Sequence, residues 1–244
     1  MDWHNRYLQQ AGWTIGVRNY LLKKAGLDDN SKILDLGCGT GALLSEFPIQ
    51  KSVHGIDINF ENLLQSQKNA SKTHLVCGDG QNLPYLNAAF DISYCHFVLL
   101  WAKQPEFLLS EMCRVTKPGG YVIAFAEPDY GGRIDFPVEL ETSAKLQIEA
   151  LRKQGADPGL GRKLPKLFVN SGLKNIEYGV IGGEWDLNSC RSDDFIESSV
   201  LREDLSGSVP IDEIEKFLRL EKESREIGAR VLFVPTFFAF GEAV

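Results

Sequence analysis

The feature that most constrains this chain is a glycine-rich stretch at residues 33–41. It reads Ile33-Leu34-Asp35-Leu36-Gly37-Cys38-Gly39-Thr40-Gly41, so a short apolar run leads directly into glycine at every second position. The residues that follow predict a helix over 40–47. Because glycine lacks a Cβ, such a turn can bring backbone N–H groups close to a ligand. The spacing is not the dinucleotide fingerprint G-x-G-x-x-G, and by itself the turn is equally compatible with a nucleotide site and with a plain tight turn.

Strand-like and helix-like segments alternate after this turn. The pattern predicts five strands and two further helices, which are strands 33–37, 52–58, 73–78, 90–96 and 121–126 and helices 59–70 and 103–116. This alternation is typical of an α/β fold with a parallel sheet wound on both faces. Ligands of such sheets bind outside the carboxyl ends of the strands. Five polar or glycine residues fall at or near that edge, namely Asp35, Gly37, Asp57, Asp79 and His96.

Two carboxylates at that edge suggest which ligand it could hold. Asp57 ends the second strand, 20 residues after Gly37, a distance at which a carboxylate can accept both hydroxyls of a ribose held by the first loop. Its alternative role is the N-cap of helix 59–70, which is compatible with ribose binding. Asp79 follows the third strand and could accept a hydrogen bond from an exocyclic amine such as adenine N6.

The segments on either side of residues 31–127 show a different pattern of predicted elements. Residues 3–26 predict a helix that either packs onto the domain or forms a lid over the glycine-rich loop. Beyond residue 127 the pattern predicts helical stretches over 137–154 and 161–171, a helical region over 192–228 whose last helix opens at Pro210, and strands 173–187 and 231–240. Nothing between those two strands resembles a parallel crossover, so an antiparallel pair at the sheet edge is expected. We find no repeat or linker and predict one domain over 1–244, with a helical lid at 1–30, a ligand-binding core at 31–127 and a substrate side at 128–244.

Composition excludes several classes of function. A net charge of −7 without a run of Lys or Arg disfavours nucleic acid and anionic membranes as partners. The five cysteines are scattered, with no C-x-x-C and no histidine cluster at metal spacing, so reduced thiols and no metal site are expected. No apolar run approaches the roughly 18 residues of a membrane span. Because a signal-peptide pattern is also absent, the sequence predicts a cytoplasmic protein.

Taken together, these motifs resemble the class I S-adenosylmethionine-dependent methyltransferases, in particular the small-molecule branch near the ubiquinone and menaquinone enzymes. Residues 33–41 match the first motif of that family, Asp57 takes the position of its ribose-binding acid, and Gly78-Asp79-Gly80 with Leu83-Pro84 is similar to its adenine-side motif. Residues 115–120 resemble its turn before strand five. The resemblance implies a Rossmann-like, doubly wound seven-stranded sheet of order 3-2-1-4-5-7-6 with strand seven antiparallel, N-terminal helices and a helical insertion before the last strand.

The resemblance also implies roles for individual residues. S-adenosyl-L-methionine, with S-adenosyl-L-homocysteine as product, would contact a set of cofactor-binding residues: Trp13, Asp35, Gly37, Cys38, Gly39, Gly41, Asp57, Ile58, Asp79, Gly80 and Cys95. His96 is the candidate general base, although a single histidine is more often structural. Three residues of the polar loop after strand five, Glu127, Tyr130 and Arg133, could bind substrate or could make turn and salt-bridge contacts.

The expected activity is methyl transfer to a small organic acceptor by in-line displacement, which requires mainly the alignment of nucleophile, methyl and sulfur. A base is needed only when the acceptor carries a proton of high pKa. The segment Ser93-Tyr94-Cys95-His96-Phe97 departs from the Asn/Asp-Pro-Pro-Tyr/Phe motif of base-modifying members. The alternatives are an RNA or protein methyltransferase and a non-catalytic cofactor-binding protein, while the glycine spacing disfavours a dinucleotide oxidoreductase. A monomer or homodimer is expected.

Overall fold

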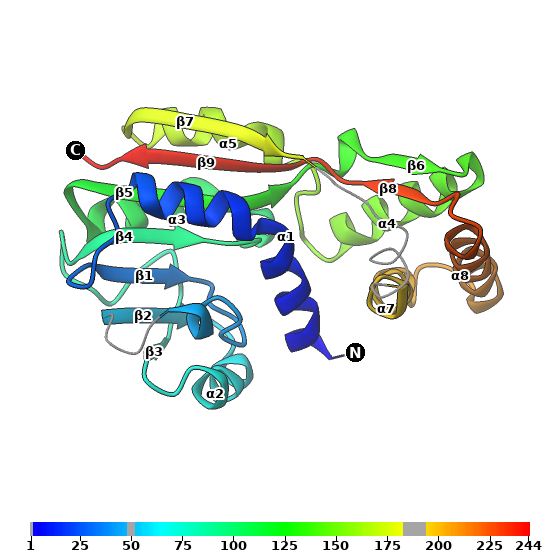
Figure 1. Cartoon of the computed structure of the whole chain (residues 1–244), viewed down its shortest axis with the longest axis horizontal. Helices are drawn as coiled ribbons and strands as arrows, with labels where there is room; N and C mark the ends of the chain where they lie inside the picture. The colour runs from blue at the N-terminus through cyan, green and yellow to red at the C-terminus, as the bar shows by residue number, and fades with distance from the viewer. Residues whose placement is uncertain (1, 48–51, 183–193) are drawn as a thin grey trace.

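The structure is a computed structural model that describes residues 2–47, 52–182 and 194–244. Seven strands form one sheet in the order β3-β2-β1-β4-β5-β9-β7 (Figure 1). Their bounds are β1 Lys32–Leu36, β2 Ser52–Asp57, β3 His74–Cys77, β4 Phe90–Cys95, β5 Thr116–Pro128, β7 Lys174–Ile181 and β9 Thr236–Glu242. β1 to β5 pair in parallel, and β9 pairs antiparallel with both β5 and β7. The expected order 3-2-1-4-5-7-6 is confirmed, with β7 as its sixth strand and β9 as its seventh.

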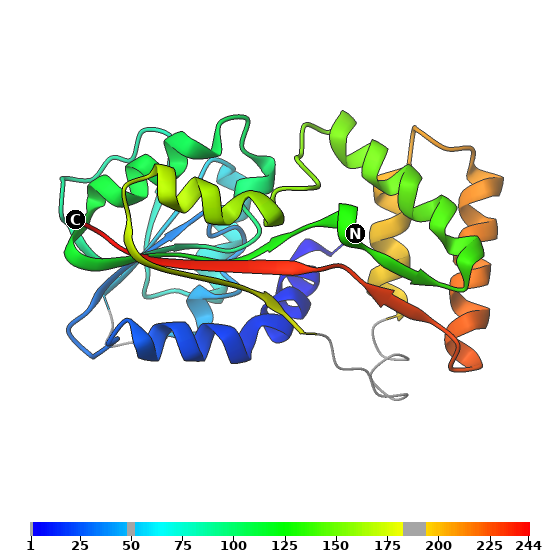
Figure 2. The same ribbon diagram turned by 90° about the horizontal axis from the view of Figure 1, so that it is seen from above.

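Helices cover both faces of this sheet, as Figure 2 shows from above. α1 (Trp3–Lys24) and α2 (Phe60–Asn69) share one hydrophobic cluster, and α3 (Pro105–Val115) and α5 (Leu164–Asn170) share the other. The alternation of side chains along β1 divides its residues between the two clusters, because successive side chains point to opposite faces of a strand. Ile33 therefore packs on the α1 side, whereas Leu34 and Leu36 pack on the α3 side.

A smaller unit lies beyond the carboxyl ends of β4 and β5 (Figure 1). We call residues 133–153 and 194–233 the cap. It contains β6 (Ile134–Phe136) paired antiparallel with β8 (Val231–Phe233), and the helices α4 (Glu141–Lys153), α7 (Asp194–Leu205) and α8 (Ile211–Glu226). These helices share a third hydrophobic cluster that includes Leu205, Ile214 and Phe217. The cap therefore has a small core of its own.

Two local expectations are wrong. The predicted helix over 40–47 is only a short 3₁₀ turn, η1 (Leu44–Glu46), because the left-handed glycines keep the chain turning as far as Gly41. The predicted strand over 231–240 is two strands, β8 in the cap and β9 in the main sheet. Pro235, which has no N–H to donate to a ladder, lies between them. Residues 183–187 of the predicted strand 173–187 lie outside the described residues.

The remaining 3₁₀ turns are η2 (Leu99–Trp101), η3 (Tyr130–Gly132), η4 (Val138–Leu140) and η5 (Gly161–Lys163). Among the described residues, no helix combines the length and the apolar character that crossing a membrane would require.

Candidate functional site

The glycine-rich loop leaves β1 and turns back against the end of β2. Gly37, Gly39 and Gly41 have φ of +72°, +50° and +80°, a region that residues with a Cβ rarely adopt. A Cβ added at Gly37 would lie 2.5 Å from Cγ2 of Val98, and one at Gly41 would lie 2.5 Å from Oγ of Ser66. The spacing of the glycines is therefore required by the turn itself.

Most of the backbone N–H groups of this loop are already bound within the protein. The N–H groups of Gly37 and Cys38 donate to the carbonyl of Ile56, at 2.7 Å and 3.1 Å. Gly39 donates to Oδ2 of Asp57 at 2.8 Å, and Gly41 donates to the carbonyl of Cys38 at 3.0 Å. These four amides do not point at a ligand, so what the loop offers is close approach of its backbone.

Asp57 ties the glycine-rich loop to the end of β2. Its Oδ2 accepts from Gly39 and its Oδ1 accepts from the Asn59 N–H, both at 2.8 Å. The alternative prediction of Asp57 as the N-cap is wrong, because the Asn59 side chain caps α2 by accepting from the N–H groups of Glu61 and Asn62. Each oxygen of an ionised carboxylate has two lone pairs, so the half-buried Asp57 retains the capacity to accept from hydroxyls.

Open surface lies beside Asp57 at the ends of β2 and β3. The Ile58 side chain is 74% exposed, which is unusual for an isoleucine that directly follows a buried strand. Asp79 is also exposed, and among the described residues its carboxylate accepts one hydrogen bond, from the nearby Gln81 N–H at 2.9 Å. The Gly78 N–H donates to the Asp57 carbonyl at 3.0 Å, which joins the two strand ends. An apolar surface between two carboxylates suits a flat ring that carries an amine and a diol.

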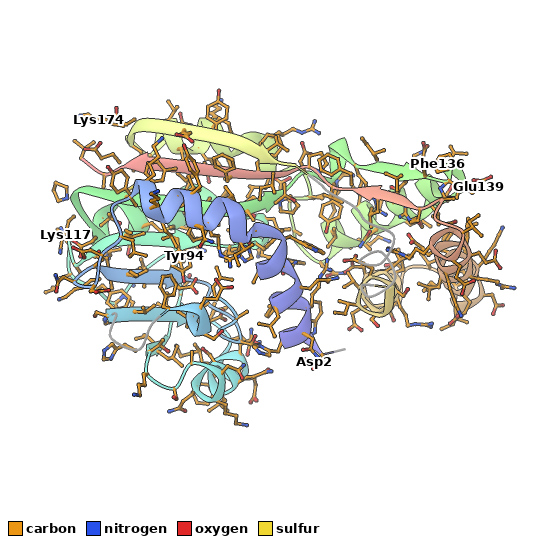
Figure 3. All side chains as sticks on the ribbon, viewed as in Figure 1. Asp2, Tyr94, Lys117, Phe136, Glu139 and Lys174 are labelled. Atoms are coloured by element: carbon orange, nitrogen blue, oxygen red, sulfur yellow. The ribbon has the colours of Figure 1, made fainter. Side chains whose placement is uncertain are left out.

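Asp35 lies on the opposite side of the loop, beneath α1. Its side chain is buried, and burial raises its pKa to about 8 while the adjacent Tyr94 hydroxyl opposes the shift. Tyr94 lies within the sheet under α1 (Figure 3). The Asp57 carboxylate also raises the pKa of Asp35, and both carboxylates raise the pKa of the buried Cys38 thiol. Because burial and the Asp57 charge disfavour the ionised form of Asp35, a cation placed beside Asp35 would favour that form.

The first half of α1 covers the glycine-rich loop. The Tyr7 ring lies 3.3 Å from where a Cβ on Gly39 would sit, and Nδ1 of His4 lies 2.8 Å from the Thr40 hydroxyl. Trp13, predicted as the cofactor residue of this helix, is half exposed, and the Arg6 guanidinium lies 4.8 Å from its ring centroid. In this structure Tyr7 rather than Trp13 contacts the loop.

His96 follows β4 and is joined to α1. Its Nε2 lies 3.0 Å from the hydroxyl of Thr14, and the Arg18 guanidinium donates to the same hydroxyl. Burial and the Arg18 charge lower the pKa of His96 to about 3, so the imidazole is neutral at physiological pH. A neutral ring already engaged through Nε2 is a weak general base in this conformation.

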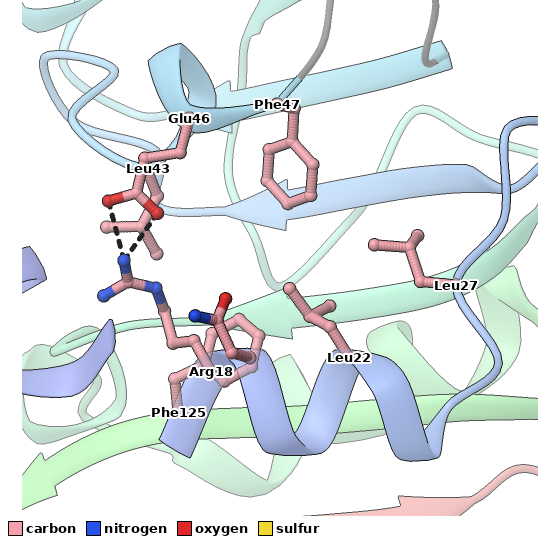
Figure 4. A pocket seen from close by; sticks show the side chains of 8 residues that line it. Arg18, Leu22, Leu27, Leu43, Glu46, Phe47 and Phe125 are labelled. Carbon is pink, nitrogen blue, oxygen red and sulfur yellow. Dashed lines mark hydrogen bonds and ion pairs between the residues drawn. The ribbon is translucent and has the colours of Figure 1, made fainter. Parts of the chain in front are cut away.

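Arg18 is itself held by Glu46, whose two carboxylate oxygens accept from Nη2. Figure 4 shows this pair at the side of a cavity of about 170 Å³, which is also lined by Leu22, Phe47 and Phe125. The cavity lies on the α1 face of the sheet. Leu43, which follows the glycine-rich loop, lines it, but no residue of 33–41 does.

The three predicted substrate residues lie where β5 meets the cap. Glu127 is fully buried and accepts from three backbone N–H groups, so in this structure it braces a loop. Arg133 pairs with Asp135 at 2.6 Å and donates to Gln147, which ties it into the cap. Tyr130 lies between α1 and the cap, and burial raises its pKa to about 12. Of the three, only Tyr130 has no hydrogen bond from its side chain within the described residues.

Sequence reasoning placed Tyr7 among the aromatic residues of a possible N-terminal lid, but it missed Thr14 and Arg18, two further residues of α1 that reach the site. Tyr7, Thr14 and Arg18 follow one another at intervals of seven and four, so they share one face of the helix. A polar stripe at that spacing on an otherwise buried face could have revealed them. Within the described ranges, we find no group of three or more His, Cys, Asp or Glu side chains arranged to hold a metal ion.

Comparisons with known proteins agree with this geometry. The family described as "Methyltransferase domain" matches residues 34–124. The demethylmenaquinone methyltransferase of Staphylococcus haemolyticus is 36% identical over 190 residues, which cover 66% of this chain and 75% of that protein. The malonyl-[acyl-carrier protein] O-methyltransferase of Buchnera aphidicola is 34% identical over 119 residues, 48% of each chain. This chain covers about half the length of several such curated relatives.

Solved structures share the fold at low sequence identity. The phosphoethanolamine N-methyltransferase 2 of Haemonchus contortus, solved with S-adenosyl-L-methionine, has a TM-score of 0.60 and 16% identity, covering 94% of this chain and 53% of that one. The geranyl diphosphate C-methyltransferase of Streptomyces coelicolor, solved with S-adenosyl-L-homocysteine, has a TM-score of 0.59 and 14% identity, covering 93% and 76%. The sheet order, the sequence family and the extensive match to the Staphylococcus enzyme lead to one conclusion. The chain belongs to the class I S-adenosylmethionine-dependent methyltransferases.

Proposed function

We propose that this enzyme transfers the methyl group of S-adenosyl-L-methionine to a small organic acceptor. The observation that carries the proposal is the position of the Asp57 carboxylate, which is half-buried at the end of β2, bonded to Gly39 and adjacent to the exposed Ile58. This arrangement fits a ribose diol with a purine beside it. Asp79 and Gly80 would meet the adenine, and Asp35 with the loop 37–41 would face the methionine part of the cofactor.

The charges of the site favour the same ligand. S-adenosyl-L-methionine carries a sulfonium and an ammonium, and a cation beside Asp35 would favour the ionised carboxylate that burial and the Asp57 charge disfavour. Cys95 is the last residue of β4 and His96 follows it, so both would border the transfer site. The cofactor supplies an activated methyl group, so the residues of this chain have to bind, orient and exclude water.

The acceptor would enter between α1 and the cap, where Arg6 of α1 pairs with Glu197 of α7 at 2.5 Å. Tyr130 faces this junction, with Arg6, Asp204 and Glu197 as its charged neighbours. Both signs of charge are present, and the chain is acidic overall. Such a lining favours a small polar acceptor over the extended phosphate backbone of a nucleic acid. The names of two relatives, a demethylmenaquinone methyltransferase and a malonyl-[acyl-carrier protein] O-methyltransferase, indicate a quinone and a malonyl group on a carrier protein as their acceptors, and neither indicates a nucleic acid.

Two measurements test this proposal. In thermal-shift assays, S-adenosyl-L-methionine or S-adenosyl-L-homocysteine at 100 times its Kd should stabilise the fold by about 2.7 kcal/mol, which raises Tm by roughly 5–10 °C for a chain of this size. NAD should leave Tm unchanged, and a shift with NAD alone would overturn the cofactor assignment. Methyl-labelled cofactor is then incubated with metabolite, RNA and protein pools. Label should appear in the small-metabolite pool, and exclusive labelling of RNA or protein would refute the acceptor class.

A further inference from the structure

We propose that Glu127 is a positioning residue, whose buried carboxylate holds the loop after β4 against the glycine-rich loop and sets the place of His96. The proposal rests on the function proposed above and concerns the loop 96–101. It assigns Glu127 to the organisation of the transfer site instead of to contact with the acceptor.

Four consecutive backbone amides of this loop converge on the end of β5. Phe97 N–H donates to the carbonyl of Ala126 at 2.9 Å. The N–H groups of Val98 and Leu99 donate to Oε1 of Glu127 at 2.9 Å and 2.8 Å, and that of Leu100 donates to Oε2 at 3.1 Å. Successive amides that point to one side form a cradle for an anion. Here the anion is the carboxylate of Glu127, which is 0% exposed.

The loop adopts a conformation that needs such support. Phe97 has a φ of +56°, which is uncommon for a residue with a bulky side chain. Val98 returns to a right-handed conformation with φ −111° and ψ −45°, and η2 begins directly after it. A left-handed residue followed by a right-handed one turns the following amides toward a common point. Without an acceptor at that point, three buried N–H groups would be unpaired.

This loop contacts the cofactor-side elements from two directions. A Cβ on Gly37 would lie 2.5 Å from the Val98 side chain, so Val98 packs directly onto the first glycine of the loop. His96, one residue before the left-handed Phe97, meets Thr14 of α1 through Nε2 at 3.0 Å. Glu127 therefore holds the segment that joins the glycine-rich loop, the end of β4 and the helix above them.

The surroundings of Glu127 contain few other charges. The Cys95 thiol on β4 is fully buried and has its pKa raised in part by Glu127. Asp129, two residues further along the chain, is paired with Arg162 at 2.5 Å, and Gly161 packs on the Glu127 carbonyl. Burial outweighs the three amide bonds and raises the pKa of Glu127 to about 7. The carboxylate thus has no cationic partner among the described residues, and its negative charge is balanced by backbone dipoles.

The test uses the full chain with Glu127→Gln, which keeps the side-chain volume but offers one acceptor oxygen for three amides. At pH 8, hydrogen exchange followed by mass spectrometry should be about 10-fold faster in residues 98–100 of the variant. Tm should change little, because relief of the buried charge offsets the loss of acceptors for the three amides. Label transfer from S-adenosyl-L-methionine to the metabolite pool should slow by about 10- to 100-fold. Binding of the cofactor, measured by calorimetry, should stay within about twofold, and at pH 6 the wild type should approach the variant in both exchange and transfer.

Asp91→Asn is the matched control, because Asp91 also accepts a backbone amide, from Lys32 at 2.9 Å, but lies at the opposite end of the sheet beside Lys117. It should leave transfer and exchange at 98–100 unchanged. Unaltered exchange at 98–100 in Glu127→Gln overturns the proposal, as does a loss of cofactor affinity that equals the loss of transfer. If the wild type itself transfers no label to the metabolite pool, the proposed acceptor class fails. The exchange result and its pH dependence then still decide whether Glu127 holds the loop.

Discussion

Replacing Asp57 with alanine should weaken the binding of S-adenosyl-L-methionine by about one to two orders of magnitude. The Asp57 carboxylate would accept the ribose hydroxyls, and losing a hydrogen bond to a charged group costs roughly 1.5–3 kcal/mol. At about 1.4 kcal/mol for each tenfold change in Kd, this corresponds to roughly a 10- to 100-fold weaker affinity. The substitution also removes the acceptors of Gly39 and Asn59, so the free protein should lose about 1–3 kcal/mol of stability.

Isothermal titration calorimetry separates these two effects. Asp57→Asn retains one side-chain oxygen and should fall between the wild type and alanine in affinity. Asn59→Ala is the matched control, because it removes the side chain that caps α2, costs about 1 kcal/mol of stability and leaves the ribose acceptor in place. If Asp57→Ala and Asn59→Ala lose the same stability and neither changes the Kd, Asp57 is only a brace for the glycine-rich loop and the ribose assignment is refuted.

Three further predictions follow from the same geometry. Gly37→Ala forces a Cβ into a left-handed residue 2.5 Å from Val98, so Tm should fall by several degrees, and an unchanged Tm would show that the loop adapts freely. Arg230→Met removes the guanidinium that bonds Asp135 and Glu221 inside the cap, and chemical denaturation should reveal a loss of about 3–5 kcal/mol. The pKa of Asp35 is about 8 in the folded state, above its usual value near 4, so this group stabilises the fold at low pH. Its contribution is lost as pH rises from about 4 through 8, by about 1.4 kcal/mol per pH unit, and Asp35→Asn should lack this slope.

Local patterns were sufficient for the architecture of the cofactor side. The alternation of strands and helices between residues 31 and 127 predicts a parallel sheet, and β1 to β5 do pair in parallel. The strand order, which is confirmed in full, was implied by the family resemblance. Gly37, Gly39 and Gly41 were recognisable because each adopts a backbone conformation that other residues rarely adopt. The helix predicted after them failed for the same reason, since a local apolar pattern cannot show how far the left-handed turn continues.

The roles of polar side chains were harder to predict, because they depend on partners distant in sequence. The sequence around Glu127 is typical of a polar loop, yet the structure buries Glu127 against the amides of residues 98–100. These residues precede α3 and β5, so they are distant from Glu127 in sequence. Trp13 and Tyr7 are both aromatic residues of α1, and only the rotation of that helix against the sheet determines which of them contacts Gly39. The division of residues 231–240 between two sheets likewise depends on where the cap docks.

The sequence by itself determined the fold class, the family and the edge of the sheet at which the cofactor is expected. The fold class and this edge follow from periodicity and from backbone requirements, which are local properties of the chain, and the family follows from the resemblance of its motifs to those of known members. Tertiary structure alone decided which polar side chains form hydrogen bonds within the protein. Asp57 is bonded to Gly39, His96 is neutral and joined to Thr14, and Glu127 is enclosed by backbone amides. The physical reason is that burial and hydrogen bonding set the charge and the availability of a side chain, and both are created only when segments far apart in sequence meet.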